Sequence, residues 1–212
     1  MKNVILIFGI RSRLKTIAEG SFFCPKCGAD RQYKLQSIRR WFTLFFLPVF
    51  PVSAAKGEIV KCATCGTGFR PEVLNTPTSA ALTDLIRNAM RVAIAAVLRA
   101  GDMTDAATRH AAIGAVRGTG IEDYDDEKLT IDVDGADISS LPAYLTPLAN
   151  GLNPAGKERF VGQVATVAAA NGTLSDAEHR VLETIGASFG LSAAYLTGIV
   201  STATATRTDE PS

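Results

Sequence analysis

Apolar residues recur at helical spacing from Ala80 onward, in a part of the chain that is also rich in alanine. The spacing of the first group, three or four residues apart, predicts a helix with one face in a core. That stripe consists of Leu82, Leu85, Ile86, Ala89, Ala93 and Val97. A stripe of this kind requires other helices to cover it.

Start and stop signals divide the rest of this region into further helices. Asn153-Pro154 is typical of an N-cap followed by the first helical position, and Ser175 with Glu178 has the spacing of a capping box. We also expect helices over 104–116 and 138–149, a helix ending at Gly190 and a last one capped by Ser192. The acidic stretch 122–137, between the helices expected over 104–116 and 138–149, is expected to be a loop.

The first 74 residues follow a different pattern, with aromatic and β-branched residues separated by glycine and proline. This pattern predicts short strands, the first of them over Val4–Phe8. The apolar segment Trp41–Val52 contains Pro48 and Pro51, which exclude an ordinary helix, and it is too short to span a bilayer. It is expected either to pack a very small core or to form an exposed patch.

These patterns predict a multidomain protein, with a small β domain followed by an all-α helical bundle. The predicted boundaries are 1–74 for the β domain, 75–79 for a linker, 80–203 for the bundle and 204–212 for a disordered tail. The bundle contains a weak internal repeat, because residues 101–106 match 172–177 in spacing and type, and each copy joins two helices.

Charge separates the same two parts. Residues 1–75 carry 12 Lys and Arg against 4 Asp and Glu, whereas residues 76–212 carry 10 against 17. A basic front can favour nucleic acid or an anionic membrane, although simple solvation of the surface gives the same pattern. The candidate phosphate contacts are Arg11, Arg13, Lys15, Lys34, Arg39 and Arg40.

All four cysteines lie in two CxxC turns, each followed by glycine: Cys24 with Cys27, and Cys62 with Cys65. Two such turns supply four thiolates for a closed tetrahedral zinc site, in which the metal organises folding and does not activate water. A four-thiolate iron site, disulfides and free thiols are the alternatives. Because the remaining residues contain no cysteine, a secreted disulfide scaffold is disfavoured and a reducing cytoplasm is expected.

Residues 4–66 resemble a bacterial zinc-ribbon family. An apolar strand and basic turn (IFGIRSRLK) precede CPKCG, and a WFTLFFLPVFPVS segment precedes the second CxxC. The resemblance implies a zinc ribbon, and it implies no enzymatic activity.

Residues 80–200 resemble the tellurite-resistance TerB-like helical domain, most clearly over Pro154–Val200. In that family, paired Ala-Asp-Gly motifs with a following Glu are thought to bind a divalent cation such as calcium or magnesium. The second copy here keeps Glu178 but has Asn171 at the Asp position. The first has Ala100 and Ala107 at the two acidic positions, so Asp102 and Asp105 are the candidate substitutes.

Other chemistry receives little support from the sequence. Asp132, Asp134 and Asp137 hint at an EF-hand loop, but the terminal bidentate Glu and the full spacing are missing. His110 and His179 lie in no catalytic motif. The sequence also contains neither of the glycine-rich phosphate-binding motifs, GxxxxGK(S/T) and a strand-linked GxGxxG. A hydrolase would need Asp102, Asp105 and Glu178 to converge on a metal with an open position.

The sequence therefore predicts a cytoplasmic, non-enzymatic adaptor or sensor of the bacterial stress response. In this interpretation zinc fixes the ribbon, and the helical domain binds a cation or an unknown protein partner. The alternatives are a zinc ribbon that binds nucleic acid, and a protein attached peripherally to a membrane through Trp41–Val52 beside the basic residues.

Overall fold

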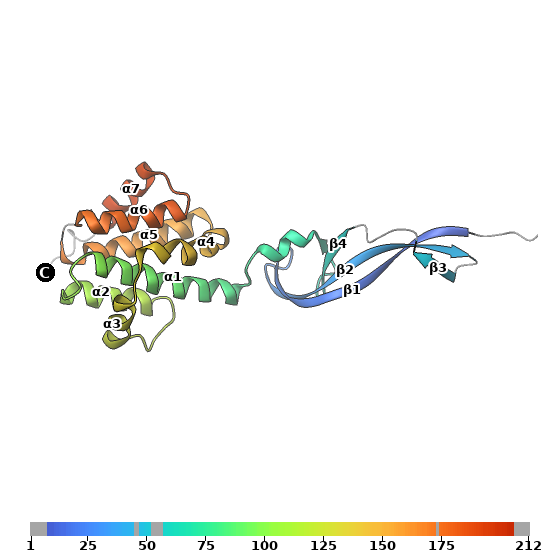
Figure 1. Ribbon diagram of the computed structural model, residues 1–212, viewed down its shortest axis with the longest axis horizontal. Coiled ribbons are helices and arrows are strands. Elements are labelled where there is room, and N and C mark those ends of the chain that lie inside the picture. The colour runs from blue at the N-terminus through green and yellow to red at the C-terminus, as the bar shows by residue number, and fades with distance from the viewer. Residues whose placement is uncertain (1–7, 45–46, 52–56, 173, 206–212) are drawn as a thin grey trace, which may run out of the picture. The chain divides into compact units, whose positions relative to one another are not determined.

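The chain divides into two compact units, Met1–Ala80 and Ala81–Ser212. The structure is a computed structural model that describes residues 8–44, 47–51, 57–172 and 174–205. The first unit is built on a β-sheet and the second on helices alone, as Figure 1 shows. The predicted order of a small β domain followed by an all-α region is confirmed.

The first unit is a five-stranded antiparallel sheet followed by a short 3-10 helix, η1 (Pro71–Asn75). Along the sheet the order is β1, β2, β4, β5, and β3 also pairs with β2. The bounds of the strands are β1 Phe8–Cys24, β2 Ala29–Leu44, β3 Leu47–Pro51, β4 Glu58–Cys62 and β5 Gly68–Phe69.

Strands β1 and β2 form one long hairpin that extends well past the rest of the sheet (Figure 1). Strand β4 pairs with β2 only between Tyr33 and Ser37, and a bulge interrupts β1 at residues 16–18. Beyond these points β3 is the one described strand that pairs with the hairpin. We call this far part the arm: residues 8–16 of β1, residues 37–44 of β2, and β3.

The first predicted strand falls mostly outside the described residues. Strand β1 starts at Phe8, the last residue of the predicted Val4–Phe8 strand, and residues 4–7 are not described. The segment from Trp41 is extended, as its prolines require, over residues 41–44 and 47–51. None of the described helices is long and apolar enough to cross a membrane.

The expectation that the aromatic and proline-rich segment packs the small core is wrong. Among the described residues, the core of the first unit consists of Phe22, Cys24, Val60 and Cys62, which lie on β1 and β4 outside the arm. In contrast, Val49 and Phe50 are 55% and 52% exposed. The register of β1 with β2 is the reason, because it places Trp41 opposite Arg11, 13 residues from Cys24 along β1.

Seven α-helices make up the described part of the second unit, together with two further 3-10 turns, η2 (Ile138–Ser140) and η3 (Ala169–Asn171). Their bounds are α1 Ser79–Ala100, α2 Ala106–Arg117, α3 Asp126–Asp134, α4 Leu141–Gly151, α5 Pro154–Ala168, α6 Asp176–Ser188 and α7 Ala193–Ala205.

The predicted apolar stripes form the core of this unit. In α1 the stripe residues Ala89, Ala93 and Val97 are fully buried, and in α4 so are Leu141, Leu145 and Leu148. Helices α5 and α6 contribute further aliphatic side chains, and Phe160 meets Phe189 edge to face with ring centroids 5.3 Å apart. One contiguous core therefore joins all seven helices.

The caps that the sequence indicated set several helix starts. The Asn153 side chain accepts a hydrogen bond from the Gly156 N–H at 2.8 Å, and Pro154 takes the first position of α5. Ser175 and Glu178 form the reciprocal capping box of α6. Gly190, whose φ is +70°, follows that helix, and Ser192 accepts a hydrogen bond from the Tyr195 N–H. These interactions agree with the predicted starts and stops.

The prediction of a loop throughout the acidic stretch 122–137 is wrong, because α3 spans Asp126–Asp134. Its N-cap Asp125 accepts from the Lys128 N–H, and acidic residues in its first turn suit the positive end of the helix dipole. Leu129 and Val133 are buried four residues apart. The many acidic residues around Leu129 and Val133 made this short amphipathic pattern hard to recognise in the sequence.

The last helix extends past the predicted start of the C-terminal tail. Helix α7 continues through residue 204 to Ala205, whereas the sequence predicted disorder from Thr204. The remainder of the predicted tail, residues 206–212, lies outside the described residues.

Candidate metal centre

Two turns of the sheet bring the four cysteines together. The first joins β1 to β2 and carries Cys24 and Cys27, and the second follows β4 and carries Cys62 and Cys65. In each turn the N–H of the following glycine donates back to the first cysteine's carbonyl, at 2.9 Å for Gly28 and 3.0 Å for Gly66. Both glycines have φ near +70°, which explains why glycine follows each CxxC.

The second turn is tied to the first by the sheet. Tyr33 of β2 pairs with Cys62 of β4, and the Ala63 N–H donates to the Gln32 carbonyl at 2.9 Å. The hairpin register therefore fixes how the two pairs of thiols face each other.

The sulfur geometry suits one tetrahedral metal ion. All four Sγ atoms lie within 4.8 Å of one another, and those of Cys24 and Cys65 are 3.9 Å apart. Four sulfurs around one zinc ion, each at about 2.3 Å, would be about 3.8 Å apart. None of the four cysteines forms a disulfide. Among the described residues, no other group of three or more His, Cys, Asp or Glu side chains converges in this way.

The surroundings of Cys27 and Cys65 shift the pKa values of these two thiols in opposite directions. The Thr67 hydroxyl and backbone N–H lower the pKa of Cys65 to about 6, because they stabilise its thiolate. Desolvation raises the pKa of Cys27 to about 12, and hydrogen bonds to the neighbouring thiols add to this effect. Thr67 thus supports the site from outside the four ligands, a role that the sequence patterns did not predict. Its position two residues after Cys65 is the one feature of the sequence that could have indicated this role.

Comparison with known families agrees with this geometry. Residues 22–82 match a zinc-ribbon family. The match covers both CxxC turns, and together with the four-cysteine cluster it indicates a structural zinc ion and not the iron or disulfide alternatives. No curated protein and no solved structure matches the chain. The TerB-like resemblance of the helical unit therefore stays a prediction.

The second set of candidate ligands is only partly brought together. Asp102, Asn171 and Glu178 line one shallow hollow between the loops that precede α2 and α6, and Asp105 does not. These loops carry the two copies of the weak internal repeat. A Cβ added to Gly101 would collide with Glu178, so the first copy lies directly against the residue that follows the second copy. No local pattern in the sequence indicated this contact of Gly101 with Glu178.

Local hydrogen bonds already use most of these carboxylates. Asp102 accepts from the Thr104 N–H and hydroxyl at 2.8 and 2.7 Å, and Asp105 caps α2 through Thr108. In both cases these bonds lower the pKa of the aspartate. One oxygen of Glu178, Oε2, accepts from the Ser175 N–H and hydroxyl.

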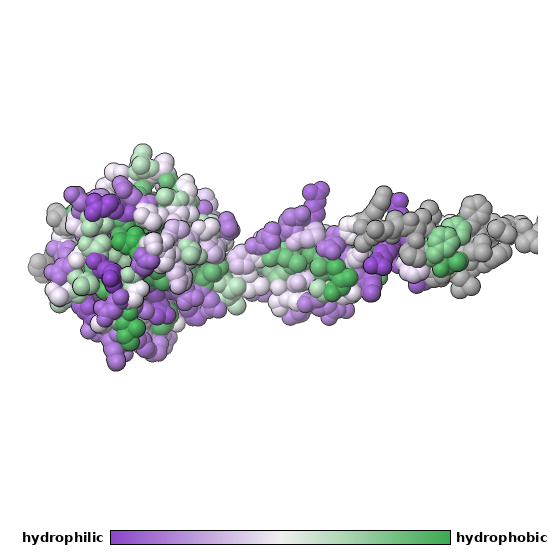
Figure 2. Space-filling view, in the orientation of Figure 1, coloured by the Kyte–Doolittle hydropathy of each residue, from purple (hydrophilic) through white to green (hydrophobic). Residues whose placement is uncertain are grey.

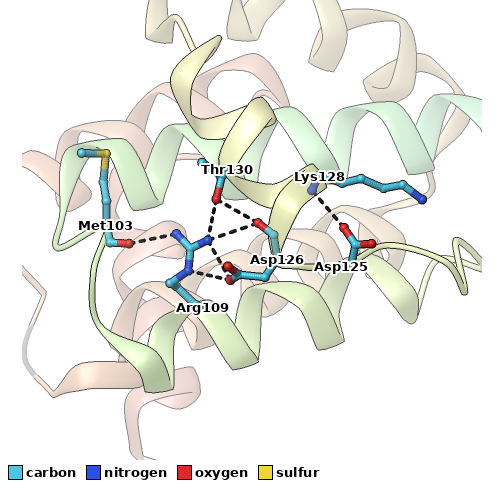
Figure 3. A network of polar contacts seen from close by, with 6 residues as sticks. All are labelled: Met103, Arg109, Asp125, Asp126, Lys128 and Thr130. Atoms are coloured by element: carbon cyan, nitrogen blue, oxygen red, sulfur yellow. Dashed lines mark hydrogen bonds and ion pairs between the residues drawn. The ribbon is translucent and has the colours of Figure 1, made fainter.

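Arg109 holds the first of these loops in place, as Figure 3 shows. Its guanidinium donates to the Met103 carbonyl at 3.1 Å, to the Asp126 side chain at 2.7 Å and to the Thr130 hydroxyl at 2.7 Å. The ion pair with Asp126 raises the pKa of Arg109 and lowers that of Asp126. The loop 101–105 is thus fastened to both α2 and α3.

The EF-hand hint is wrong, because Asp132 and Asp134 belong to α3 and Asp137 caps η2. Asp132 accepts three hydrogen bonds: from Arg91 Nε at 2.9 Å, from Arg91 Nη2 at 2.6 Å and from the Tyr124 hydroxyl at 2.7 Å. Burial raises the pKa of Asp132, but these bonds outweigh burial and the net pKa lies below its ordinary value. Its role is to join α1 and α3.

The candidate phosphate contacts separate into two groups. Arg13, Lys15, Arg39 and Arg40 are exposed on the arm, whereas Lys34 lies nearer the cysteines and pairs with Glu19 at 3.2 Å. Arg11 stands opposite Trp41 in the register of β1 with β2.

Proposed function

We propose that this protein is a non-enzymatic adaptor in which one structural zinc ion fixes the ribbon and the helical unit serves as a separate binding module. The observation that carries the proposal is the closed four-cysteine centre, because four thiolates leave a zinc ion no open position for a substrate or water. The helical unit has a contiguous core of its own, which fits an independent role.

The placement of the remaining reactive groups supports a role without catalysis. Asp102, Asp105 and Glu178 serve as turn and cap residues. His110 and His179 are both exposed, on α2 and α6, and His179 Nδ1 contacts the Ser175 carbonyl. A hydrolase would need several of these groups to face one reacting atom.

The finer assignment, a cytoplasmic TerB-like protein of the bacterial stress response, rests on the resemblance of residues 154–200 to the tellurite-resistance domain. A reducing cytoplasm would keep the four thiols available for metal. The helical unit's partner is expected to be a protein, and the excess of acidic over basic residues after residue 75 favours a basic surface on it.

Crosslinking followed by mass spectrometry in bacterial cells that produce the full chain tests the adaptor proposal. We expect one set of proteins crosslinked to residues before 80 and another to residues after 80. The variant Cys62→Ser should lose the first set and keep the second, because only the ribbon depends on zinc. Loss of both sets together, or no reproducible partner for either unit, would contradict the proposal.

A divalent cation is a second candidate ligand of the helical unit, and one observation favours it. Glu178 is only 3% exposed, and while its Oε2 atom completes the capping box, its Oε1 atom faces Gly101 at the hollow that Asp102 and Asn171 also line. Carboxylate and amide oxygens are the ligands that calcium and magnesium prefer. We propose that a cation bound there would bridge the two copies of the repeat.

Calorimetric titration with calcium and with magnesium tests this second candidate. Glu178→Gln removes the charge but keeps the capping box, because glutamine also serves at that position. We expect binding by the wild-type chain and a loss of about tenfold or more in Glu178→Gln and Asp102→Asn. Asp134→Asn, an exposed acid elsewhere, is the matched control. No heat of binding would leave the helical unit a metal-free module, and equal binding by all variants would contradict a site at Glu178 and Asp102.

A further inference from the structure

The arm of the first unit combines positive charge with exposed apolar surface. Residues 8–18 and 35–51 contain three and two Lys or Arg residues, respectively, and no Asp or Glu. Leu14, Val49 and Phe50 are each more than half exposed. Figure 2 shows hydrophobic surface close to the far end of the hairpin. Neither the zinc centre nor the core of the unit explains these residues.

The strand register sorts the arm's side chains into two faces. Arg13 lies directly opposite Arg39, and Lys15 follows Arg13 on the same face of β1. Leu14 lies opposite Ile38 on the other face. Phe42 and Phe50 also pair across strands on that second face, where their rings stack at 5.1 Å. One face is therefore cationic, and the other is largely apolar.

Four basic residues of the arm form no ion pair with the described residues. Arg13, Lys15 and Arg39 lie on the cationic face, and Arg40 lies opposite Ser12 on the other face; all four are exposed, in contrast to Lys34, which pairs with Glu19. Like charges directly opposite each other on neighbouring strands, as at Arg13 and Arg39, destabilise a sheet. An anionic surface would relieve that repulsion.

We propose that the arm binds the surface of an anionic lipid bilayer. Its apolar face would enter the headgroup and acyl boundary, while the long basic side chains would reach the anionic headgroups. Phosphates of a nucleic acid would neutralise the cationic face but would leave Leu14 and Phe50 in water. The lipid surface is the occupant that accounts for both faces, and this role is independent of the adaptor function.

Co-sedimentation of the full chain with vesicles tests the proposal. We expect binding to phosphatidylcholine vesicles that contain phosphatidylserine, little binding to pure phosphatidylcholine, and weaker binding as salt is raised. Each basic residue near an anionic surface contributes about fivefold to affinity, so Arg39→Gln with Arg40→Gln should weaken binding about 25-fold. Lys34→Gln with Lys61→Gln removes the same charge from the sheet outside the arm and should have little effect.

The apolar face is tested separately by Phe50→Ser. Because Phe50 stacks on Phe42, its replacement can loosen the arm, so Leu14→Ser is the second variant, and retained zinc verifies that the ribbon is folded. Trp41, the chain's single tryptophan, lies in β2 on the same face as Arg39 and reports contact of the arm's basic face with the headgroup region. Its emission should shift to shorter wavelength with anionic vesicles and be quenched by brominated lipid.

Three outcomes would overturn the proposal. The first is no sedimentation with anionic vesicles, and the second is equal loss of binding in the arm and control double variants. The third is a duplex DNA complex that forms tightly and salt-dependently while vesicles fail to shift Trp41 emission. That third result would assign the cationic face to nucleic acid.

Discussion

Replacement of Cys62 by serine is expected to unfold the ribbon while the helical unit stays folded. Four buried side chains form the core in the part of the first unit that the structure describes, and two of them, Cys24 and Cys62, are themselves metal ligands. Structural zinc binding contributes about 10–16 kcal/mol to the folding of such small domains. Loss of one thiolate therefore removes most of what stabilises this unit. Zinc removal by a chelator should have the same effect.

Two-dimensional amide NMR of the full chain measures this prediction region by region. In Cys62→Ser, signals from the sheet should collapse to unfolded positions, whereas those from residues 81–205 should keep theirs. Ala63→Ser is the matched control, because Ala63 is exposed in the same turn and is not a ligand. A dispersed ribbon spectrum in Cys62→Ser would show that the hydrophobic contacts suffice without metal.

Replacement of Asp132 by alanine is expected to lower the free energy of unfolding of the helical unit by about 2–3 kcal/mol. Asp132 is mostly buried, and its removal leaves the Arg91 guanidinium and the Tyr124 hydroxyl without their shared acceptor. Because Arg91 is partly exposed to solvent, we expect the loss of free energy of unfolding to lie at the lower end of the range for buried ion pairs. Urea denaturation followed by helical circular dichroism measures it. Asp134→Ala, an exposed position in the same helix, should change stability by less than about 0.5 kcal/mol.

The same interaction has a defined pH dependence. Because the folded-state pKa of Asp132 is depressed, its contribution is fully present above the carboxyl's ordinary pKa and is lost as pH falls through the folded-state pKa. The stability difference between wild type and Asp132→Ala should therefore narrow in acid. A constant difference down to the lowest pH at which the protein folds would contradict the ion-pair explanation.

Sequence patterns predicted the elements that depend on local signals. The two CxxC-Gly turns, the apolar stripe of α1 and the caps at Asn153 and Ser175 each lie within a few residues, so their chemistry can be read directly. The prediction for the ribbon's aromatic segment failed because strand pairing between distant residues determines where that segment lies. The register of β1 with β2 carries Trp41 away from the core, and no local pattern contains that register.

Charge misled the sequence interpretation at α3. Acidic residues there indicated a loop, but Asp125 caps the helix and Asp132 pairs with Arg91, 41 residues away. The contact of Gly101 with Glu178 is equally non-local, since it joins the first copy of the repeat to the residue that follows the second copy. A carboxylate that looks like a candidate ligand in the sequence can instead bind a residue far away in the chain and serve a structural role. Such distant partners can be identified only in the folded chain.

The metal content of the purified full chain, measured by elemental analysis, tests the central claim most directly. We expect one zinc per chain, retained in Ala63→Ser and lost in Cys24→Ser and Cys62→Ser. Iron at the same stoichiometry, or a folded ribbon that contains no metal, would contradict the assignment of Cys24, Cys27, Cys62 and Cys65 as a structural zinc centre.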